Sequence, residues 1–183
     1  YIGSHTVVEL QNAGYEPVVM DNLSNSSEKS LERVTAITGK EVPFYKADIL
    51  DREALEAIFS KEEIGAVIHF AGLKAVGESV AKPIEYYRNN IVGTLNLIEE
   101  MRDHNCFKLV FSSSATVYGK PKIVPIKEDF ELSTTNPYGT TKLYIEQILK
   151  DLCVADKRFS VVLLRYFNPI GAHSSGLIGE DPN

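Results

Sequence analysis

The sequence predicts an α/β fold in which helices cover both faces of a parallel β-sheet. Short apolar runs of strand length alternate with longer segments of helical periodicity, and clusters of polar residues follow the apolar runs. Because strands that alternate with helices are joined by right-handed crossovers, they pair in parallel. We therefore expect a Rossmann-like, doubly wound parallel sheet that binds its ligands at the carboxyl ends of the strands.

Five apolar runs are the expected strands, at residues 17–20, 42–47, 66–70, 108–111 and 161–164. Helices are expected at residues 3–12, 28–37 and 51–59, after Pro83 and after Pro137. Gly14 is placed to end the first helix and Asp51 to start the third. The expected buried stripes of the last two helices are Ile84, Tyr87, Ile91, Leu95, Ile98 and Met101, and Ile145, Ile148, Leu149 and Leu152.

The composition indicates one ordinary domain. The chain has 183 residues, and its net charge of −6 is spread without basic runs, so we expect no nucleic-acid partner and no membrane surface. No apolar stretch approaches the roughly 18–20 residues of a membrane span, and no secretion signal is recognisable. Cys106, Cys153 and the four histidines lack the spacing of a disulfide framework or a metal site. We expect a cytoplasmic protein without a bound metal.

Gly3 and Asp21 are candidates for binding a dinucleotide. A glycine between the first strand and the first helix lets the backbone approach a pyrophosphate, and an acidic residue about 20 positions later binds ribose hydroxyls. Small residues such as Ala71 and Gly72 at the end of an apolar run would let a flat ring lie against the backbone. Packing glycines, a turn-forming aspartate and a solvated Lys74 explain the same residues, so spacing alone leaves both interpretations open.

Tyr138 and Lys142 could form a catalytic base. A tyrosine with an unperturbed pKa near 10 is a poor base at neutral pH unless positive charge stabilises its phenolate. Lys142 lies four residues later on the same helical face, and Ser114 at the end of a neighbouring strand could share the reacting proton. A solvated helical pair is the alternative. The serines lack the GxSxG pattern of a hydrolase nucleophile.

Six segments together form a specific pattern: residues 1–6 (YIGSHT), 21–23 (DNL), 69–79 (HFAGLKAVGES), 112–119 (SSSATVYG), 136–139 (NPYG) and 165–173 (RYFNPIGAH). On these segments the sequence resembles the extended short-chain dehydrogenase/reductases and, within them, the UDP-galactose (UDP-glucose) 4-epimerases. The resemblance implies NAD-mediated oxidation of a UDP-hexose to a 4-keto sugar and reduction from the opposite face, in galactose metabolism. Related 4,6-dehydratases eliminate water with an Asp-Glu pair; the matching positions here are Ala115 and Thr116, which favours epimerisation.

The resemblance also implies roles for individual residues. Tyr138 would be the catalytic base, Lys142 its electrostatic partner and Ser114 the second hydroxyl of a proton relay. The residues implied to bind NAD are Tyr1, Ile2, Gly3, Asp21, Asn22, Asn25, Ser26, Asp48, Ile49, Phe70, Ala71, Gly72, Lys74, Asn90, Tyr138, Lys142 and Tyr166. Those implied to bind the UDP-hexose are Lys74, Ser114, Thr116, Tyr138, Phe167 and Asn168.

Parts of the family pattern are absent, so we interpret the sequence as a fragment. It opens on Tyr1 without an initiator methionine and closes on loop-like residues 181–183. The first strand, two earlier glycines and most of a C-terminal substrate domain are missing. We expect residues 1–168 to form an incomplete NAD-binding domain and residues 169–183 to begin a truncated substrate-binding region. The fragment alone is expected neither to hold NAD tightly nor to turn over.

Two other activities and a mode of assembly stay open. Another NAD-dependent nucleotide-sugar dehydrogenase or decarboxylase would release NADH or a keto product instead of recycling its cofactor. A sugar-nucleotide sensor on the same fold should have lost Tyr138 or Lys142, and both are present. The resemblance implies a homodimer in which the helices after Pro83 and Pro137 pack against their copies, although burial against the sheet explains the same stripes.

Overall fold

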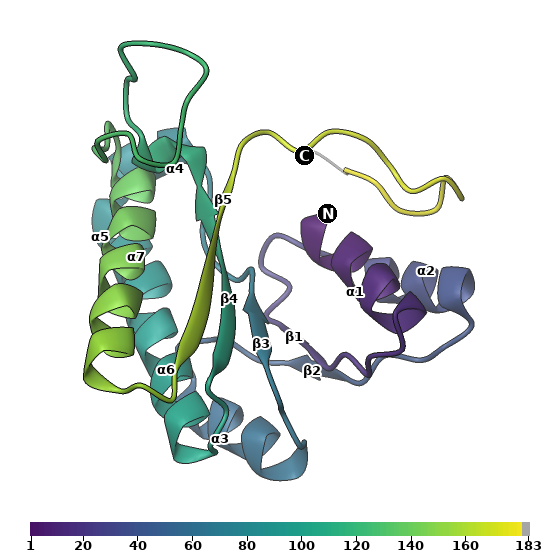
Figure 1. Ribbon diagram of the computed structural model, residues 1–183. Coiled ribbons are helices and arrows are strands. Elements are labelled where there is room, and N and C mark those ends of the chain that lie inside the picture. Colours follow the sequence, from purple (N-terminus) through teal and green to yellow (C-terminus); the bar gives the residue numbers. More distant parts are fainter. Residues whose placement is uncertain (181–183) are drawn as a thin grey trace. The chain divides into compact units, whose positions relative to one another are not determined.

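A computed structural model describes residues 1–180, which form two compact units (Figure 1). The first unit contains residues 1–48 and 168–180, and the second unit runs from Ile49 to Phe167. The predicted substrate-binding region, residues 169–183, is described only to residue 180, and residues 181–183 lie outside the described part. Each unit has a sheet whose strands pair in parallel. The predicted α/β class with parallel strands is confirmed.

The first unit contains, in chain order, α1 (Ile2–Asn12), β1 (Val19–Asp21), α2 (Lys29–Thr38) and β2 (Phe44–Lys46). β1 pairs with β2, with Val19 opposite Phe44. Gly14 follows α1 with φ of 88°, a left-handed conformation that costs glycine little and suits the end of a helix. The core of this unit is formed by Val7, Val8, Val34 and Ile178. The segment 168–180 therefore belongs to the core of the first unit through Ile178.

The second unit contains, in chain order, α3 (Arg52–Lys61), β3 (Val67–His69), α4 (Val76–Ala81), α5 (Pro83–Tyr87), a π turn (Arg88–Val92), α6 (Gly93–Asp103), β4 (Lys108–Ser114), a 3₁₀ turn (Ala115–Val117), α7 (Pro137–Ala155) and β5 (Ser160–Tyr166). The strands lie in the order β3-β4-β5. The Asp51 carboxylate accepts the Ala54 amide at 3.0 Å, so the predicted start of α3 is confirmed. None of the described helices has the length and apolar character of a membrane span.

The long helix predicted before β4 is interrupted by the π turn. A π turn inserts an extra residue into the helical repeat and rotates the side chains that follow it. Tyr86, Asn90 and Thr94 are buried, whereas Ile84 and Leu95 of the expected stripe are 66% and 39% exposed. The stripe prediction is wrong for these two residues because it assumed an unbroken period of 3.6, whereas the π turn lies between them and the buried face before it is out of phase with the buried face after it.

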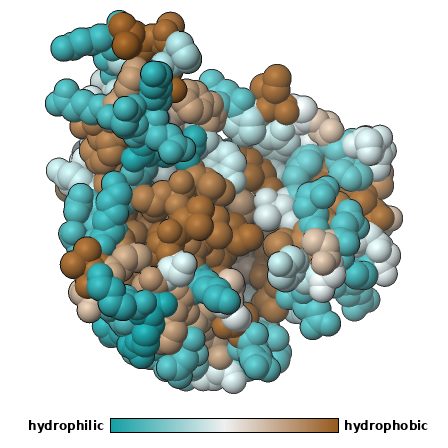
Figure 2. Space-filling model, viewed as in Figure 1, coloured by the Kyte–Doolittle hydropathy of each residue, from teal (hydrophilic) through white to brown (hydrophobic). Residues whose placement is uncertain are grey.

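The sheet of the second unit carries α7 on one face (Figure 1). Along β5, Val161, Leu163 and Arg165 alternate with Val162 and Leu164, and the last two are 49% and 39% exposed. Figure 2 shows hydrophobic residues gathered over β5. The side chains of β5 that face α7 are therefore the partly buried set, which includes a charged residue.

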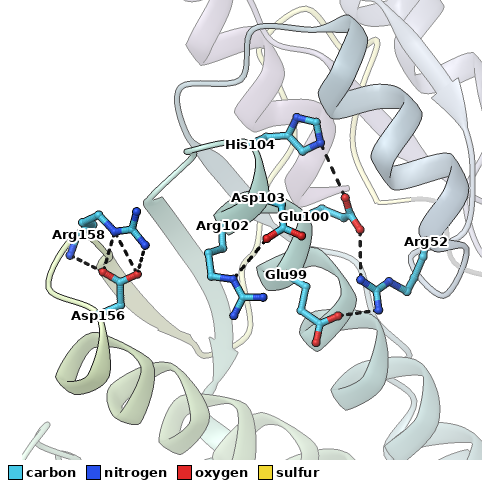
Figure 3. A network of polar contacts seen from close by, with 8 residues as sticks. All are labelled: Arg52, Glu99, Glu100, Arg102, Asp103, His104, Asp156 and Arg158. Carbon is cyan, nitrogen blue, oxygen red and sulfur yellow. Dashed lines mark hydrogen bonds and ion pairs between the residues drawn. The ribbon is translucent and has the colours of Figure 1, made fainter.

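Ion pairs on the surface of the second unit join α3 to α6 (Figure 3). Arg52 lies 2.8 Å from a Glu99 oxygen and 3.5 Å from a Glu100 oxygen. A second pair, Asp156 with Arg158 at 2.7 Å, closes the turn before β5. Exposed pairs of this kind contribute up to about 1 kcal/mol each. They supplement the apolar packing of the unit and provide control positions for variants inside it.

Candidate active site

β4 ends in three consecutive serines, and the last of them shapes the following turn. The Ser114 hydroxyl oxygen accepts the Thr116 amide at 3.2 Å and the Thr116 hydroxyl at 3.0 Å. Ser114 thus caps the 3₁₀ turn that carries Thr116. These two hydroxyl groups, both expected to face a sugar, lie within hydrogen-bonding distance of each other.

α7 begins close to this turn. Pro137 occupies its first turn, and the Asn136 side chain accepts the Gly139 amide at 2.8 Å. A side chain at Gly139 would approach the Thr116 hydroxyl to 3.3 Å, which is tighter than most packed contacts. The absence of a side chain at Gly139 therefore lets the first turn of α7, which carries Tyr138, pack closely on the turn at the end of β4.

Tyr138, Lys142 and Ser114 are brought together in the second unit by β4 and α7. The Ser114 side chain lies near enough to the Tyr138 phenol to lower the pKa of that phenol by hydrogen bonding. Lys142 is only 5% exposed, and its Nζ donates to the Ser112 carbonyl at 2.7 Å. The same Nζ lies 6.0 Å from the centroid of the Tyr138 ring. The sequence left open that Tyr138 and Lys142 are a solvated helical pair. In the structure the lysine is buried and the tyrosine is half-buried.

Burial controls the protonation of both groups. It raises the pKa of the Tyr138 phenol above 10, and the hydrogen bond with Ser114 opposes this shift. It lowers the pKa of Lys142 from 10.5 to about 8. Within the described residues the Lys142 ammonium donates to a single protein acceptor, so two of its three N–H groups are available to a ligand hydroxyl. The protein groups alone do not make Tyr138 a base at neutral pH.

Asn90 anchors the loop that follows β3. Its Oδ1 accepts the Leu73 amide at 2.8 Å, while its Nδ2 donates to the Leu73 carbonyl at 2.9 Å and to the Thr141 hydroxyl at 3.0 Å. A side chain at Gly72 would approach Asn90 Oδ1 to 3.2 Å, and φ at Gly72 is 154°. Asn90, implied to bind NAD, thus uses its amide to hold the loop containing Ala71, Gly72 and Lys74 against α7.

The other implied ligand residues of the second unit lie at strand ends or near them. The rings of Phe70 after β3 and Tyr166 at the end of β5 have centroids 6.4 Å apart. Lys74 is exposed, and Phe167 is 59% exposed. Ile49 is buried against Gly93, whose lack of a side chain leaves room for it.

In the first unit a polar cluster forms at the carboxyl ends of β1 and β2. Asp21 Oδ1 accepts the Leu23 amide and the Ser26 hydroxyl, each at 2.7 Å. Asn22 Nδ2 donates to Asp48 Oδ2 at 2.8 Å. Both of these bonds to Asp21 use Oδ1, so within the described residues its Oδ2 has no hydrogen-bond partner.

The remaining implied residues of the first unit lie at its termini and loops. Ile2 and Gly3 begin α1, and the Tyr1 hydroxyl donates to the Gly171 carbonyl at 2.6 Å. Asn25 and Asn168 are exposed. The contacts of these five residues within the described part of the first unit do not point to a ligand.

Sequence reasoning missed a buried ion pair beside the site, between Glu146 on α7 and Arg165 on β5. Two signals could have found it. Glu146 follows Lys142 by four residues and shares its helical face. Arg165 is a charged residue at the end of an apolar strand pattern, and such a residue needs a partner when it is buried.

Beside a parallel sheet, the end of β4 thus brings together a buried serine, a buried lysine and a half-buried tyrosine. Residues 1–180 match the model of the NAD dependent epimerase/dehydratase family, and the chain belongs to that family.

Individual relatives agree with this assignment. The chain is 67% identical over 184 residues to a UDP-glucose 4-epimerase of Haemophilus influenzae and 66% identical over 183 residues to one of Bacillus subtilis; each match covers 100% of this chain and 54% of the relative. A crystal structure of UDP-glucose 4-epimerase from Bifidobacterium longum, in complex with NAD+ and UDP, matches with a TM-score of 0.97 at 58% identity, covering 100% of this chain and 55% of that chain. The chain therefore spans about half the length of the curated relatives that it matches. The predicted Rossmann-like fold is confirmed.

Proposed function

We propose that this chain carries the cofactor-binding and catalytic part of a UDP-glucose 4-epimerase, an NAD-dependent isomerase of galactose metabolism. The observation that carries the proposal is the grouping of Tyr138, Lys142 and Ser114 at the end of β4. The 67% identity to an enzyme of that name supports it. The substrates would be UDP-glucose and UDP-galactose.

NAD fits the polar groups that the structure leaves available. The Oδ2 of Asp21, which has no hydrogen bond within residues 1–180, suits a ribose diol and would repel the 2′-phosphate of NADP. The two spare N–H groups of Lys142 suit the hydroxyls of a second ribose. When bound, NAD would supply the hydride acceptor for C4 of the sugar.

The side chains would carry out the proton transfer. Tyr138 would take the proton of the sugar 4-hydroxyl, and Ser114, whose side chain lowers the pKa of the Tyr138 phenol, would share that proton. Lys142 would place its charge near the phenolate that forms, because the Ser112 carbonyl fixes its ammonium. Thr116 would contact the hexose, and Phe167 and Asn168 would border it. Reduction of the 4-keto sugar from its opposite face then completes the epimerisation.

The turn after β4 argues against dehydration. Elimination of water needs an acid and a base beside the sugar, and the positions concerned hold Ala115 and Thr116. Thr116 directs its hydroxyl to Ser114. A methyl group and a bonded hydroxyl supply no carboxylate, so epimerisation is the reaction that the turn supports.

The function can be tested on a chimera in which residues 1–183 replace the matching 54% of the Haemophilus influenzae relative. The chimera is expected to convert UDP-galactose to UDP-glucose without net release of NADH. Residues 1–183 alone should show no turnover and only weak NAD binding, because they span about half of that enzyme. A coupled assay for UDP-glucose and the absorbance of NADH measure both outcomes. Robust conversion by residues 1–183 alone would contradict the second expectation, and accumulation of NADH by the chimera would favour a dehydrogenase.

We also propose a homodimer formed through the helices of the second unit. Large apolar side chains are exposed on α5, α6 and α7, among them Ile84 (66%), Leu95 (39%) and Tyr144 (53%). Burying such a set excludes water from a sizeable apolar area. Sedimentation of the chimera should give twice the mass of one chain, and replacing Ile84 and Leu95 together by Glu should give a monomer. Ile123, 67% exposed in the loop before α7, is the control position whose Glu variant should stay dimeric.

We propose that the protein is cytoplasmic. The two cysteines, Cys106 and Cys153, are free thiols, which suits the reducing cytoplasm.

Residues 1–168 would form the cofactor-binding domain, and residues 169–183 would begin the substrate-binding region. We propose no nucleic-acid or membrane partner, on the evenly spread charge.

A further inference from the structure

Glu146 is a fully buried carboxylate that the proposed reaction does not use. It follows Tyr138 by eight residues and Lys142 by four, on the same face of α7. Its Oε2 accepts Arg165 Nη2 at 2.7 Å and its Oε1 accepts Arg165 Nε at 3.0 Å. This two-pronged, charge-assisted contact fixes distance and orientation together. It joins α7 to β5.

The segments that carry Ser114, Thr116 and Tyr138 are each connected to this ion pair. The hydroxyl of Ser113, the neighbour of Ser114, donates to Glu146 at 2.5 Å. Arg165 Nη1 donates to the Tyr118 hydroxyl at 2.8 Å, and its guanidinium carbon lies 4.9 Å from the centroid of the Tyr118 ring. Tyr118 directly follows the 3₁₀ turn that carries Thr116. The pair therefore connects the end of β4, that turn, α7 and β5.

Three consecutive residues of β4 meet three successive turns of α7. The Ser112 carbonyl accepts Lys142 and the Ser113 hydroxyl donates to Glu146, while Ser114 lies near enough to Tyr138 to lower the pKa of its phenol. Of these contacts, the one at Glu146 is reinforced by the planar fork of an arginine. A rotation of α7 about its axis would break that fork first, because its two bonds require one geometry.

The carboxylate of Glu146 carries its charge at neutral pH. Burial alone would raise its pKa, but the hydrogen bonds from Arg165 and Ser113 and the charge of Arg165 outweigh burial and hold the pKa below the ordinary value. Lys150 adds a weaker attraction at 3.8 Å. The pair is thus ionic throughout the pH range in which an epimerase would work.

We propose that Glu146 and Arg165 are a positioning pair, which sets the rotation of α7 against β4 and β5 and so holds Tyr138 at Ser114. The kinetic consequences rest on the proposed function, whereas the placement of Tyr138 does not. A purely structural pair would affect the free energy of unfolding and leave the protonation of Tyr138 unchanged. The two roles therefore predict different results.

The decisive variant of the chimera replaces both members of the pair by methionine, Glu146→Met with Arg165→Met. Removing one partner would leave a buried charge unpaired, whereas apolar replacement of both often preserves stability. We expect kcat for UDP-galactose to fall about 10- to 100-fold, because a displacement near 1 Å at reacting groups has effects of that size. KM should change less than about twofold, because uniform binding is retained. The ascending limb of the kcat–pH profile should move to higher pH, since Ser114 would no longer lower the pKa of Tyr138.

Two further variants calibrate this result. Arg165→Lys keeps the positive charge and loses the fork, so its kcat should lie between those of the chimera and the double variant. Should the double variant fail to fold, the kcat of Arg165→Lys decides whether the pair has a positioning role or a purely structural one. Glu99→Gln removes an exposed ion pair of the same unit and should leave kcat and the pH profile unchanged.

A titration measures the pKa of Tyr138, and so reports on its placement, without the need for turnover. The difference in tyrosinate absorbance between the chimera and its Tyr138→Phe version gives the pKa of Tyr138, and the same difference is taken in the double-methionine background. We expect a higher pKa in that background. A folded double variant with unchanged kcat, pH profile and Tyr138 titration would overturn the proposal. A chimera without epimerase activity would instead count against the proposed function, while the titration still decides the role of the pair.

Discussion

Replacing Tyr138 by Phe is expected to lower kcat of the chimera for UDP-galactose by about 10²- to 10⁴-fold, the range that a positioned general base contributes. Phe keeps the ring that packs near Lys142 and removes only the hydroxyl, whose pKa Ser114 lowers. KM should change little, because a group that acts on the proton in the transition state contributes less to binding the ground state. Initial rates at saturating UDP-galactose measure the loss.

A control tyrosine lies outside the second unit. Tyr15, after α1, is 65% exposed, so Tyr15→Phe should retain the rate of the parent chimera. Both variants should unfold at similar urea concentrations, since neither removes apolar volume. Equal rates for the parent and Tyr138→Phe would exclude Tyr138 as the base.

Elements with strong local signals could be predicted from the sequence. Gly14 after α1, Asp51 before α3 and Pro137 in the first turn of α7 mark helix ends through backbone chemistry that acts within a few residues. The π turn before α6 was missed because its cause is not local. Its Asn90 side chain bonds to the loop after β3 and to Thr141 on α7, partners 17 and 51 residues away. The short helix α4 was missed as well, since six residues give too few turns to establish a period.

In the candidate site, too, features with local signals could be predicted and tertiary contacts could not. Tyr138 and Lys142 are paired by helical spacing, and Ser114 ends an apolar run, so their proximity could be anticipated. The bond from Lys142 to the Ser112 carbonyl could not be, because it depends on how closely α7 packs on β4. The partnership of Glu146 with Arg165 likewise links a helix to a strand through tertiary packing. Sequence periodicity identifies a face, whereas the partner across that face is set by the fold.

Burial favours the uncharged forms of the two ionisable site residues on α7, Tyr138 and Lys142. Burial raises the pKa of Tyr138 and lowers that of Lys142, and both shifts disfavour the charged forms that the proposed mechanism uses. The free energy that holds Lys142 in this position must come from packing and from bonds elsewhere on the helix, such as the ion pair at Glu146. Lys142 should therefore be important for turnover and unfavourable for stability.

Replacing Lys142 by Met tests the first half of this expectation. A cation near a phenol favours the phenolate and lowers its pKa, so removing the cation should raise the pKa of Tyr138. The ascending limb of the kcat–pH profile should move to higher pH, and kcat at pH 7 should fall by about 10²-fold or more, as for loss of a group that acts in proton transfer. Lys157, exposed after the end of α7, supplies the control, and Lys157→Met should retain the rate and the profile.

The same variant should be more stable than the parent when nucleotide has been removed. The pKa of Lys142 is about 8 in the folded protein, below its ordinary value of 10.5, so the unfolded chain binds this proton more tightly. The resulting cost to folding is fully present below pH 8 and disappears as the pH rises towards 10.5. A shift of this size corresponds to a gain on the order of 3 kcal/mol for Lys142→Met at pH 7. Urea unfolding of both proteins between pH 7 and 10 should show the difference narrowing above pH 8; a variant that is less stable at pH 7 and fully active would show that Lys142 serves packing instead of the charge of the site.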